Sequence, residues 1–267
     1  MGFSFDPAVI ALILLATALY VRAVRVLARR GWKVPLRQQA FWHSGVALMA
    51  VGLLSPVDGL GEDLLSAHMA QHLLIADLAA PLLLAGLRTP VLVFYLPRPV
   101  LVPLARSHGL RRFFRFIRRP LVAIPIWIVT LYGWHLGFAF QGALDSDLVH
   151  ALQHQCFVAA SLLVWWSAIE PNKARLSGEL WKAGYILGSR LAGMFLGMAF
   201  IAMRSPAYGA YGERAREHGL APLADQQIAG GMMLTLDLAI MLAAFAFFFY
   251  RAGQDHDRAE HRAAVAG

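Results

Sequence analysis

Long apolar runs with few charges are the feature that most constrains what this chain can fold into. Seven such runs follow one another, at residues 8–27, 40–56, 64–87, 120–139, 147–169, 182–203 and 226–250. A helix needs about 20 mostly apolar residues to cross the hydrocarbon core of a bilayer. The pattern therefore predicts an all-α polytopic membrane protein, a bundle of about seven transmembrane helices.

Composition agrees with this class. Apolar residues make up 58% of the chain and charged residues 15%, against roughly 45–50% and about 25% in soluble domains. The length suits one helical bundle, so we expect a single transmembrane domain over 1–250 and a polar, disordered cytoplasmic tail over 251–267. The start lacks the basic region of a cleavable signal peptide, so we expect the first run to remain as a span.

The placement of charge predicts an orientation. Basic residues fill the segments 22–37 and 88–119, and Lys173, Arg175 and Lys182 follow the fifth run, whereas loops 57–63 and 140–147 carry Asp or Glu. Positively charged loops stay in the cytoplasm, which puts the N-terminus outside and the C-terminus inside. The net charge of +8 resides mainly in these loops, so we expect membrane lipid as a partner and no nucleic acid.

Two further segments carry packing or surface signals. Arginines alternate with phenylalanines between Arg111 and Arg119, which suggests a helix lying on the inner membrane surface, with an ordinary basic loop as the alternative. Glycines recur in the sixth run, at Gly184, Gly188, Gly193 and Gly197. Two Gly-x-x-x-Gly pairs let neighbouring helices approach closely, so we expect tight packing along that helix.

Five histidines fall inside apolar runs, where an ionisable side chain is costly and therefore indicates a function. These are His68, His72, His135, His150 and His154. Two His-x-x-Gln-His motifs hold four of them, and a spacing of four puts both imidazoles of a pair on one helix face, as in helices that give two ligands to one metal. The predicted topology places all five about 5–13 Å below the outer membrane edge.

The residues themselves leave the ligand open. Neutral imidazole suits copper, zinc, iron and nickel, and nearby methionines favour Cu(I). A haem held between paired histidines is the alternative, and a purely structural role through hydrogen bonds is another. Cys156 is the single cysteine, which excludes a Cys-x-x-Cys metal or redox motif.

Polar residues deep in other runs form a supporting set. Gln226, Met233 and Asp237 share one face of the last helix, and Asp77 lies at a similar depth on the third. A buried carboxylate there could orient a ligating histidine, carry protons or pair with a cation.

Six sequence motifs together resemble one protein family. They are Ser55-Pro56-Val57-Asp58, His68-Met69-Ala70-Gln71-His72, Trp134-His135-Leu136, His150-x-x-Gln153-His154, Trp165-Trp166 and Asp225-Gln226-Gln227-Ile228-Ala229-Gly230-Gly231. From about residue 40 to 250 the chain resembles the CtaG-type cytochrome c oxidase assembly factors, which are distinct from the single-span, cysteine-bearing copper chaperone of the same label. The proline expected soon after Trp-His is replaced here by Gly137 and Phe138.

The resemblance implies a multi-pass protein of the bacterial inner membrane that helps to mature a respiratory haem–copper oxidase. It implies oxidase subunits and periplasmic copper carriers as partners, and no catalytic turnover. Copper at the five-histidine site is then the expected cofactor. A membrane haem protein in quinone-linked electron transfer and a copper permease remain the alternative functions.

Reporter fusions test the predicted orientation. We expect a periplasm-active reporter to work in loops 57–63, 140–147 and 204–225, because the opposite loops carry the Arg and Lys excess. The same reporter should be silent at residue 110. Activity at residue 110 would contradict the topology and the shared depth of the histidines.

Overall fold

The computed structural model describes residues 6–169 and 179–266, and this part of the chain is helical with no strand. In chain order the elements are α1 (Pro7–Ala28), α2 (Leu36–Leu54), α3 (Pro56–Asp63), α4 (Leu65–His72), the π-helix η1 (Leu73–Ala79), α5 (Ala80–Gly86), α6 (Val91–Tyr95), α7 (Arg98–Arg106), α8 (His108–Ile117), α9 (Pro120–Trp134), α10 (Gly137–Asp145), α11 (Asp147–Ile169), α12 (Glu179–Ala202), the 3₁₀ turn η2 (Gly209–Tyr211), α13 (Gly212–Glu217) and α14 (Pro222–Ala266). The predicted all-α class is confirmed. Lys173 and Arg175, which entered the orientation argument, lie outside the described residues.

Between five and seven helical segments could cross a membrane. Five are long and apolar enough by themselves: Pro7–Ala28, Leu65–Gly86, Asp147–Ile169, Leu180–Ala202 and Pro222–Gln254. Two bent pairs, α2 with α3 and α8 with α9, bring the number to as many as seven, which is the predicted number. The bends within these pairs are 45° and 75°.

The fourth predicted run departs from the observed helix. The apolar run 120–139 predicts one span, but α9 ends at Trp134 and a separate helix, α10, begins at Gly137. Leu136 has an extended backbone, with φ −66° and ψ 137°, which breaks the helix between them. Hydropathy alone does not register such a break, because the residues on both sides are apolar.

The third span contains a π-helix at its centre. Residues Leu73–Ala79 continue α4 and lead directly into α5, near whose start Pro81 stands. Proline has no N–H to bond the carbonyl four residues earlier, which here belongs to Asp77. A wider turn accommodates this, and π-helical segments inside α-helices often mark functional sites.

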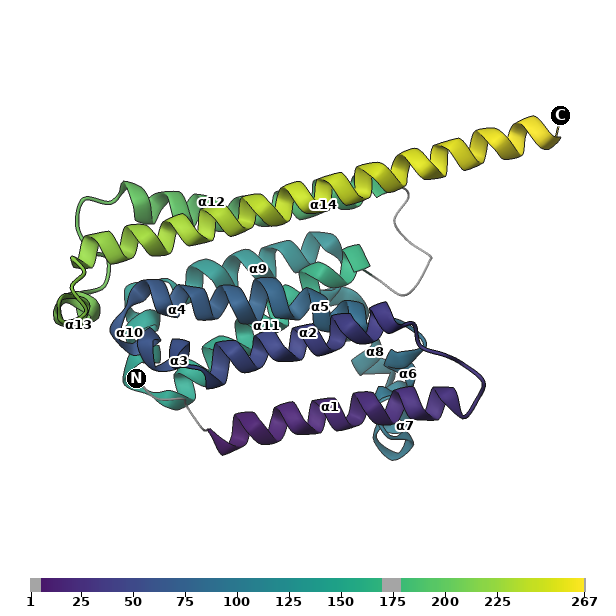
Figure 1. The fold of residues 1–267 in the computed structure, drawn as a ribbon, viewed down its shortest axis with the longest axis horizontal. Helices are drawn as coiled ribbons and strands as arrows, with labels where there is room; N and C mark the ends of the chain where they lie inside the picture. The colour runs from purple at the N-terminus through teal and green to yellow at the C-terminus, as the bar shows by residue number, and fades with distance from the viewer. Residues whose placement is uncertain (1–5, 170–178, 267) are drawn as a thin grey trace.

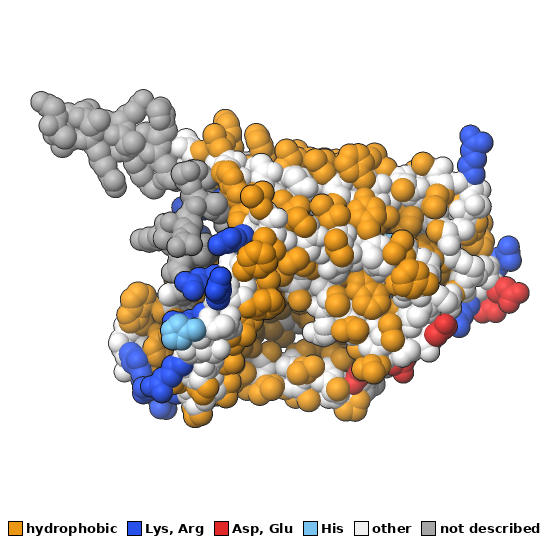
Figure 2. All heavy atoms as spheres, turned by 180° about the vertical axis from the view of Figure 1, so that it is seen from behind, with side chains coloured by type: hydrophobic (Ala, Val, Ile, Leu, Met, Phe, Trp, Pro, Cys, Tyr) orange, Lys and Arg blue, Asp and Glu red, His pale blue; other side chains and the backbone are white. Residues whose placement is uncertain are grey.

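The long helices and the continuous span of α4, η1 and α5 run alongside one another, and the other short helices gather at the two ends (Figure 1). α14 packs against α12 and α4, while α11 lies against α9, η1 and α5. One end of the bundle holds α3, α10 and α13, and the opposite end holds α6, α7 and α8 (Figure 1). Figure 2 shows a broad hydrophobic band between an end where Lys and Arg gather and an end that carries Asp and Glu together with further Lys or Arg. This distribution fits a membrane bundle.

The basic segment 89–119 folds into α6, α7 and α8 instead of one span. The expected helix of alternating arginines and phenylalanines is present as α8, with Phe113, Phe114 and Phe116 exposed. It turns 75° away from α9. Its location on the inner membrane surface stays a prediction.

The predicted disorder after residue 250 is wrong for the backbone as far as Ala266. α14 continues through this segment as a helix (Figure 1). The physical reason lies in the residues, which are rich in alanine and arginine and contain no proline. These are strong helix formers, and a helix already begun in the last span extends through them.

Glycines let α12 approach α14 closely. A Cβ on Gly197 would lie 2.8 Å from the carbonyl oxygen of Gly230, and a Cβ on Gly193 would clash with Oδ2 of Asp237. The prediction of close approach is therefore confirmed for these two glycines. It is wrong for Gly184 and Gly188 as far as the described residues go, since a Cβ there would meet none of them within 4 Å.

Replacing Gly193 should be far more damaging than replacing Gly188. In Gly193→Ala the new methyl group must displace the Asp237 carboxylate from a buried ion pair, and breaking such a pair costs about 3–5 kcal/mol. We expect the melting temperature in detergent to fall by several degrees. Gly188→Ala on the same helix is the control and should leave it unchanged or slightly higher, since alanine favours helix. Equal melting temperatures would contradict the close packing.

Candidate metal centre

Two helices bring four of the predicted histidines together. His68 and His72 project from α4, and His150 and His154 project from α11. The ring centroids of His68 and His150 are 5.0 Å apart, and those of His72 and His154 are 5.2 Å apart. Within each helix the paired rings are 4.3 and 4.2 Å apart. We call these four residues the histidine cluster.

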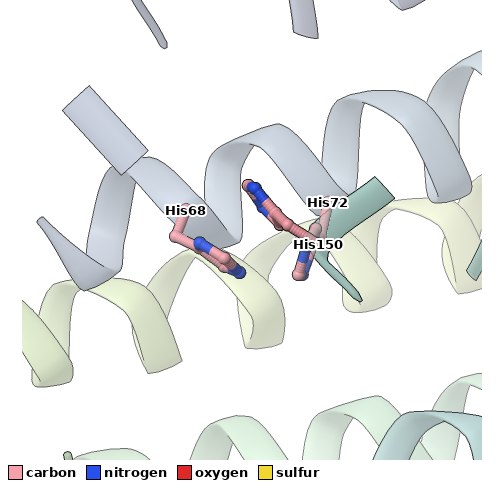
Figure 3. Close-up of side chains that lie close together, drawn as sticks. All are labelled: His68, His72 and His150. Carbon is pink, nitrogen blue, oxygen red and sulfur yellow. The ribbon is translucent and has the colours of Figure 1, made fainter. Parts of the chain in front are cut away.

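The tightest part of the cluster involves three residues. One nitrogen each from His68, His72 and His150 lies within 4.8 Å of the other two (Figure 3). Two nitrogens bound to one ion at about 2.0 Å are at most about 4 Å apart, so small rotations of the rings would close them on a metal. The side-chain chemistry and the spacing thus fit a metal ion.

Unpartnered nitrogen atoms support this fit. Both ring nitrogens of His68 and of His72, and Nε2 of His150 and His154, are buried without a hydrogen-bond partner among the described residues. Buried polar groups in proteins are nearly always hydrogen-bonded. Burying these six nitrogens without partners is costly, and one nitrogen of each ring could recover part of that cost as a metal ligand.

His135, the fifth predicted ligand, lies beside Met69. It caps the end of α9, and its Nδ1 is 2.7 Å from the carbonyl oxygen of Leu131. Its Nε2 is 3.5 Å from the sulfur of Met69. His135 and His72 both line a cavity of about 30 Å³ that also reaches Met233.

The helix that carries His68 and His72 is capped by a residue from the last helix. Leu64 precedes α4 and has no side chain able to cap it. Asp225, which is fully buried, accepts hydrogen bonds from the amides of Leu65 at 2.7 Å and Ser66 at 3.1 Å. A carboxylate at this position satisfies free amides and interacts favourably with the helix dipole.

Sequence reasoning did not assign Asp225 a role at the site. Its signal was its position in the Asp-Gln-Gln motif, but only the tertiary fold shows that it caps a helix far away in sequence. By capping α4, Asp225 fixes the position and orientation of the helix that carries His68 and His72.

Gln71 holds the same helix from the other side. It lies between the two histidines in sequence, and its amide nitrogen donates to the carbonyl of Gly52 at 2.9 Å and to Asp58 at 2.6 Å. These bonds join α4 to the end of α2 and to α3. The glutamine of the first His-x-x-Gln-His motif therefore positions the helix.

Gln226, expected to be a supporting polar residue, fastens the segment that follows α12. Its side-chain oxygen accepts from the amide of Ala207 at 2.6 Å, and its nitrogen donates to the carbonyl of Phe200 at 3.1 Å. It is buried, as its place on the face shared with Met233 and Asp237 predicts.

Two tyrosines from this segment cover the centre. The hydroxyl of Tyr208 donates to the carbonyl of His135 at 2.7 Å, and its ring stacks on Phe140 at 3.9 Å between centroids. The hydroxyl of Tyr211 donates to the carbonyl of Gly61 at 3.0 Å. Burial raises the pKa of both phenols, so each stays a protonated donor at neutral pH.

The two deep carboxylates share one cation. Arg190 on α12 is 1% exposed, and its Nη1 donates to Asp77 on η1 and, at 3.2 Å, to Asp237 on α14. Its guanidinium also lies over the ring of Trp127, 5.0 Å from the centroid. Sequence reasoning considered a cation for these aspartates but missed Arg190, although it stands in the middle of the sixth apolar run.

Comparison with known proteins assigns the chain to a family. The model of the cytochrome c oxidase caa3 assembly factor family (Caa3_CtaG) matches residues 18–254. The chain belongs to this family. No curated protein and no solved structure matched the chain in the same comparisons. The family match spans α4, η1, α9, α11 and α14, which carry the cluster, His135 and the buried aspartates, so the centre is part of the Caa3_CtaG domain.

Loss of the long-range cap should loosen α4 without unfolding the bundle. Asp225→Ala leaves the amides of Leu65 and Ser66 without an acceptor, and losing a helix cap costs about 1–2 kcal/mol. We expect a lower melting temperature and faster amide hydrogen exchange confined to the start of α4. Asp145→Ala, which removes only an exposed bond to Gln141, is the control. Unchanged exchange in Asp225→Ala would show that the cap is dispensable.

Proposed function

We propose that this Caa3_CtaG protein binds copper at the histidine cluster and presents it for the assembly of cytochrome c oxidase. The observation that carries the proposal is the convergence of four imidazoles, which together hold six buried, unpartnered nitrogens. Neutral imidazoles are good ligands for copper. Burying their nitrogens away from water costs free energy, which binding a metal ion would offset. The role is that of an assembly factor without catalytic turnover.

The surroundings favour copper over harder ions. The cluster offers uncharged nitrogen ligands, and a thioether, Met69, stands on the same helix. Hard ions such as Mg²⁺ and Ca²⁺ select oxygen ligands instead. Zinc would also accept imidazoles, so the copper assignment rests additionally on the family's link to a copper-containing oxidase.

Space argues against the haem alternative. The cavity next to the cluster measures about 30 Å³. Cofactor pockets commonly measure about 300–1,000 Å³. The rings of the cluster also lie 4.2–5.2 Å apart between centroids, which leaves no room for a porphyrin between them.

The proposed setting is the bacterial inner membrane, with the cluster in the outer leaflet. Oxidase subunits would be the receiving partners, periplasmic copper carriers would supply the ion, and lipid would surround the hydrophobic band. A site in the outer leaflet would receive copper from the periplasmic side without requiring transport across the whole membrane. This arrangement favours delivery over the permease alternative.

Two single substitutions test the proposal. We expect His72→Ala and His154→Ala each to lower copper affinity by orders of magnitude, since losing one of three or four ligands leaves an incomplete shell. Both proteins should still insert, because alanine is well tolerated in a membrane helix. The measurement is copper and iron per purified protein, with oxidase activity of the host membranes read alongside.

His108→Ala is the matched control, since His108 is exposed at the start of α8. It should retain copper and oxidase activity. Full copper content and normal oxidase activity in both cluster variants would overturn the proposal. Loss of haem in place of copper would favour the electron-transfer alternative.

A further inference from the structure

A small cavity separates the histidine cluster from the buried ion pairs. It measures about 30 Å³, and six of its lining residues carry ligand-type or charged side chains. They are Met69, His72, Asp77, His135, Met233 and Asp237. Because His72 also belongs to the cluster, the cavity opens directly beneath it. A space of this size holds an ion or one to two waters, but no larger group.

The contact between His135 and Met69 is unusual for two neutral side chains. The carbonyl of Leu131 can only accept, so Nδ1 of His135 must carry the proton in the 2.7 Å bond to it. In the neutral ring, Nε2 then presents a lone pair, 3.5 Å from the thioether sulfur of Met69. Thioether sulfur is likewise an acceptor without a proton. Two acceptors facing each other are stabilised when a cation lies between them.

The distance suits a metal ion. An N···S separation of 3.5 Å corresponds to an angle of about 110° at a metal with bonds of about 2.0 Å to nitrogen and 2.3 Å to sulfur. This is the angle between two ligands of a tetrahedral ion. His72 and Met233 line the same cavity and are buried, so they are placed to complete such a shell. Two thioethers with two imidazoles form a soft ligand set.

The adjacent ion pairs supply a matching countercharge. Arg190 bonds both Asp77 and Asp237, so the three side chains together carry one net negative charge when both carboxyl groups are ionised. A charge left unbalanced in apolar surroundings is expensive. One monovalent cation in the cavity would neutralise it, whereas a divalent cation would leave an excess positive charge.

We propose a second, deeper metal site for a soft monovalent cation, Cu(I) or its analogue Ag(I). Met69 and His135 are its core ligands, Met233 and His72 complete it, and the Asp77–Arg190–Asp237 group balances its charge. The inference deepens the proposed function and rests on it in one respect: His72 serves both sites and connects them. An ion received at the cluster can thus move inward without losing all its ligands.

The test uses the full chain purified in detergent and loaded with Cu(I). X-ray absorption at the copper edge should show sulfur in the first shell. In Met69→Leu/Met233→Leu we expect the sulfur contribution to disappear and the Cu(I) affinity to fall at least tenfold. Leucine has a similar size, so the melting temperature should change little. Met198→Leu is the control, since Met198 is 41% exposed on α12, and it should behave like the parent.

A second double variant separates the two proposals. His68→Ala/His150→Ala removes cluster ligands and leaves the deeper set complete, so sulfur-bound copper should persist. Copper bound by nitrogen alone in the parent would overturn the deeper site and leave the cluster proposal standing. The total copper bound per protein should fall in this variant, and an undiminished total would overturn the cluster. Absence of copper binding by the parent would overturn both.

The charge balance has its own test. Asp237→Asn keeps the shape of the side chain but removes the net negative charge, so Cu(I) affinity should fall about tenfold or more. Asp237→Glu retains the charge and should be less affected. Ag(I) should bind the parent as Cu(I) does, whereas Zn(II) should not displace it from the sulfur ligands. Equal Cu(I) affinity of Asp237→Asn and the parent would overturn the role assigned to the charge.

Discussion

The ion pairs of Arg190 inside the apolar bundle are the interaction on which the rest of the structure depends. They join η1, α12 and α14 through Asp77 and Asp237. Removing one partner of such a buried group leaves an uncompensated charge, typically at a cost of about 3–5 kcal/mol. The ion pair requires a glycine at position 193, because any Cβ there would occupy the space of the Asp237 carboxylate. The absence of a side chain at Gly193 is therefore required both for the close packing of α12 on α14 and for the ion pair of Arg190 with Asp237.

The histidine cluster is built on the framework that these pairs stabilise. α4 carries two of its imidazoles, and both ends of that helix are held by distant residues. Asp225 on α14 caps its start, and the π-helix that follows it ends in contact with the Arg190 group through Asp77. α14 thus helps to position α4 at both ends, directly through Asp225 and indirectly through Asp237, which shares Arg190 with Asp77. α11 then needs only to present His150 and His154 at the matching height.

The small cavity is lined both by a residue of the histidine cluster and by residues of the ion pairs. His72 faces it from the cluster, and Asp77 and Asp237 face it from the charged group. A cation in this space would lie close to neutral ligands and to the carboxyl groups of Asp77 and Asp237, in surroundings of low dielectric constant. Membership in the Caa3_CtaG family gives the arrangement a biological setting, the assembly of a cytochrome c oxidase.

The sequence by itself determined the fold class, because apolar runs of membrane-spanning length leave the chain few alternatives to a helical bundle. It also determined which histidines meet. A spacing of four fixes His68 with His72 and His150 with His154 on single helix faces, and alternating loops bring both pairs to one level. Its motifs were sufficient to identify the family. These features are local, or follow from the order of spans along the chain.

Only the tertiary structure decided which partners lie across helices. The cap that Asp225 provides, the cation that Arg190 shares and the contact of His135 with Met69 all join residues far apart in sequence. No periodicity encodes such pairs, since helix rotation and tilt are set by packing between neighbours. The break after Trp134 and the helical course of α14 to Ala266 likewise depended on backbone conformation that hydropathy does not report.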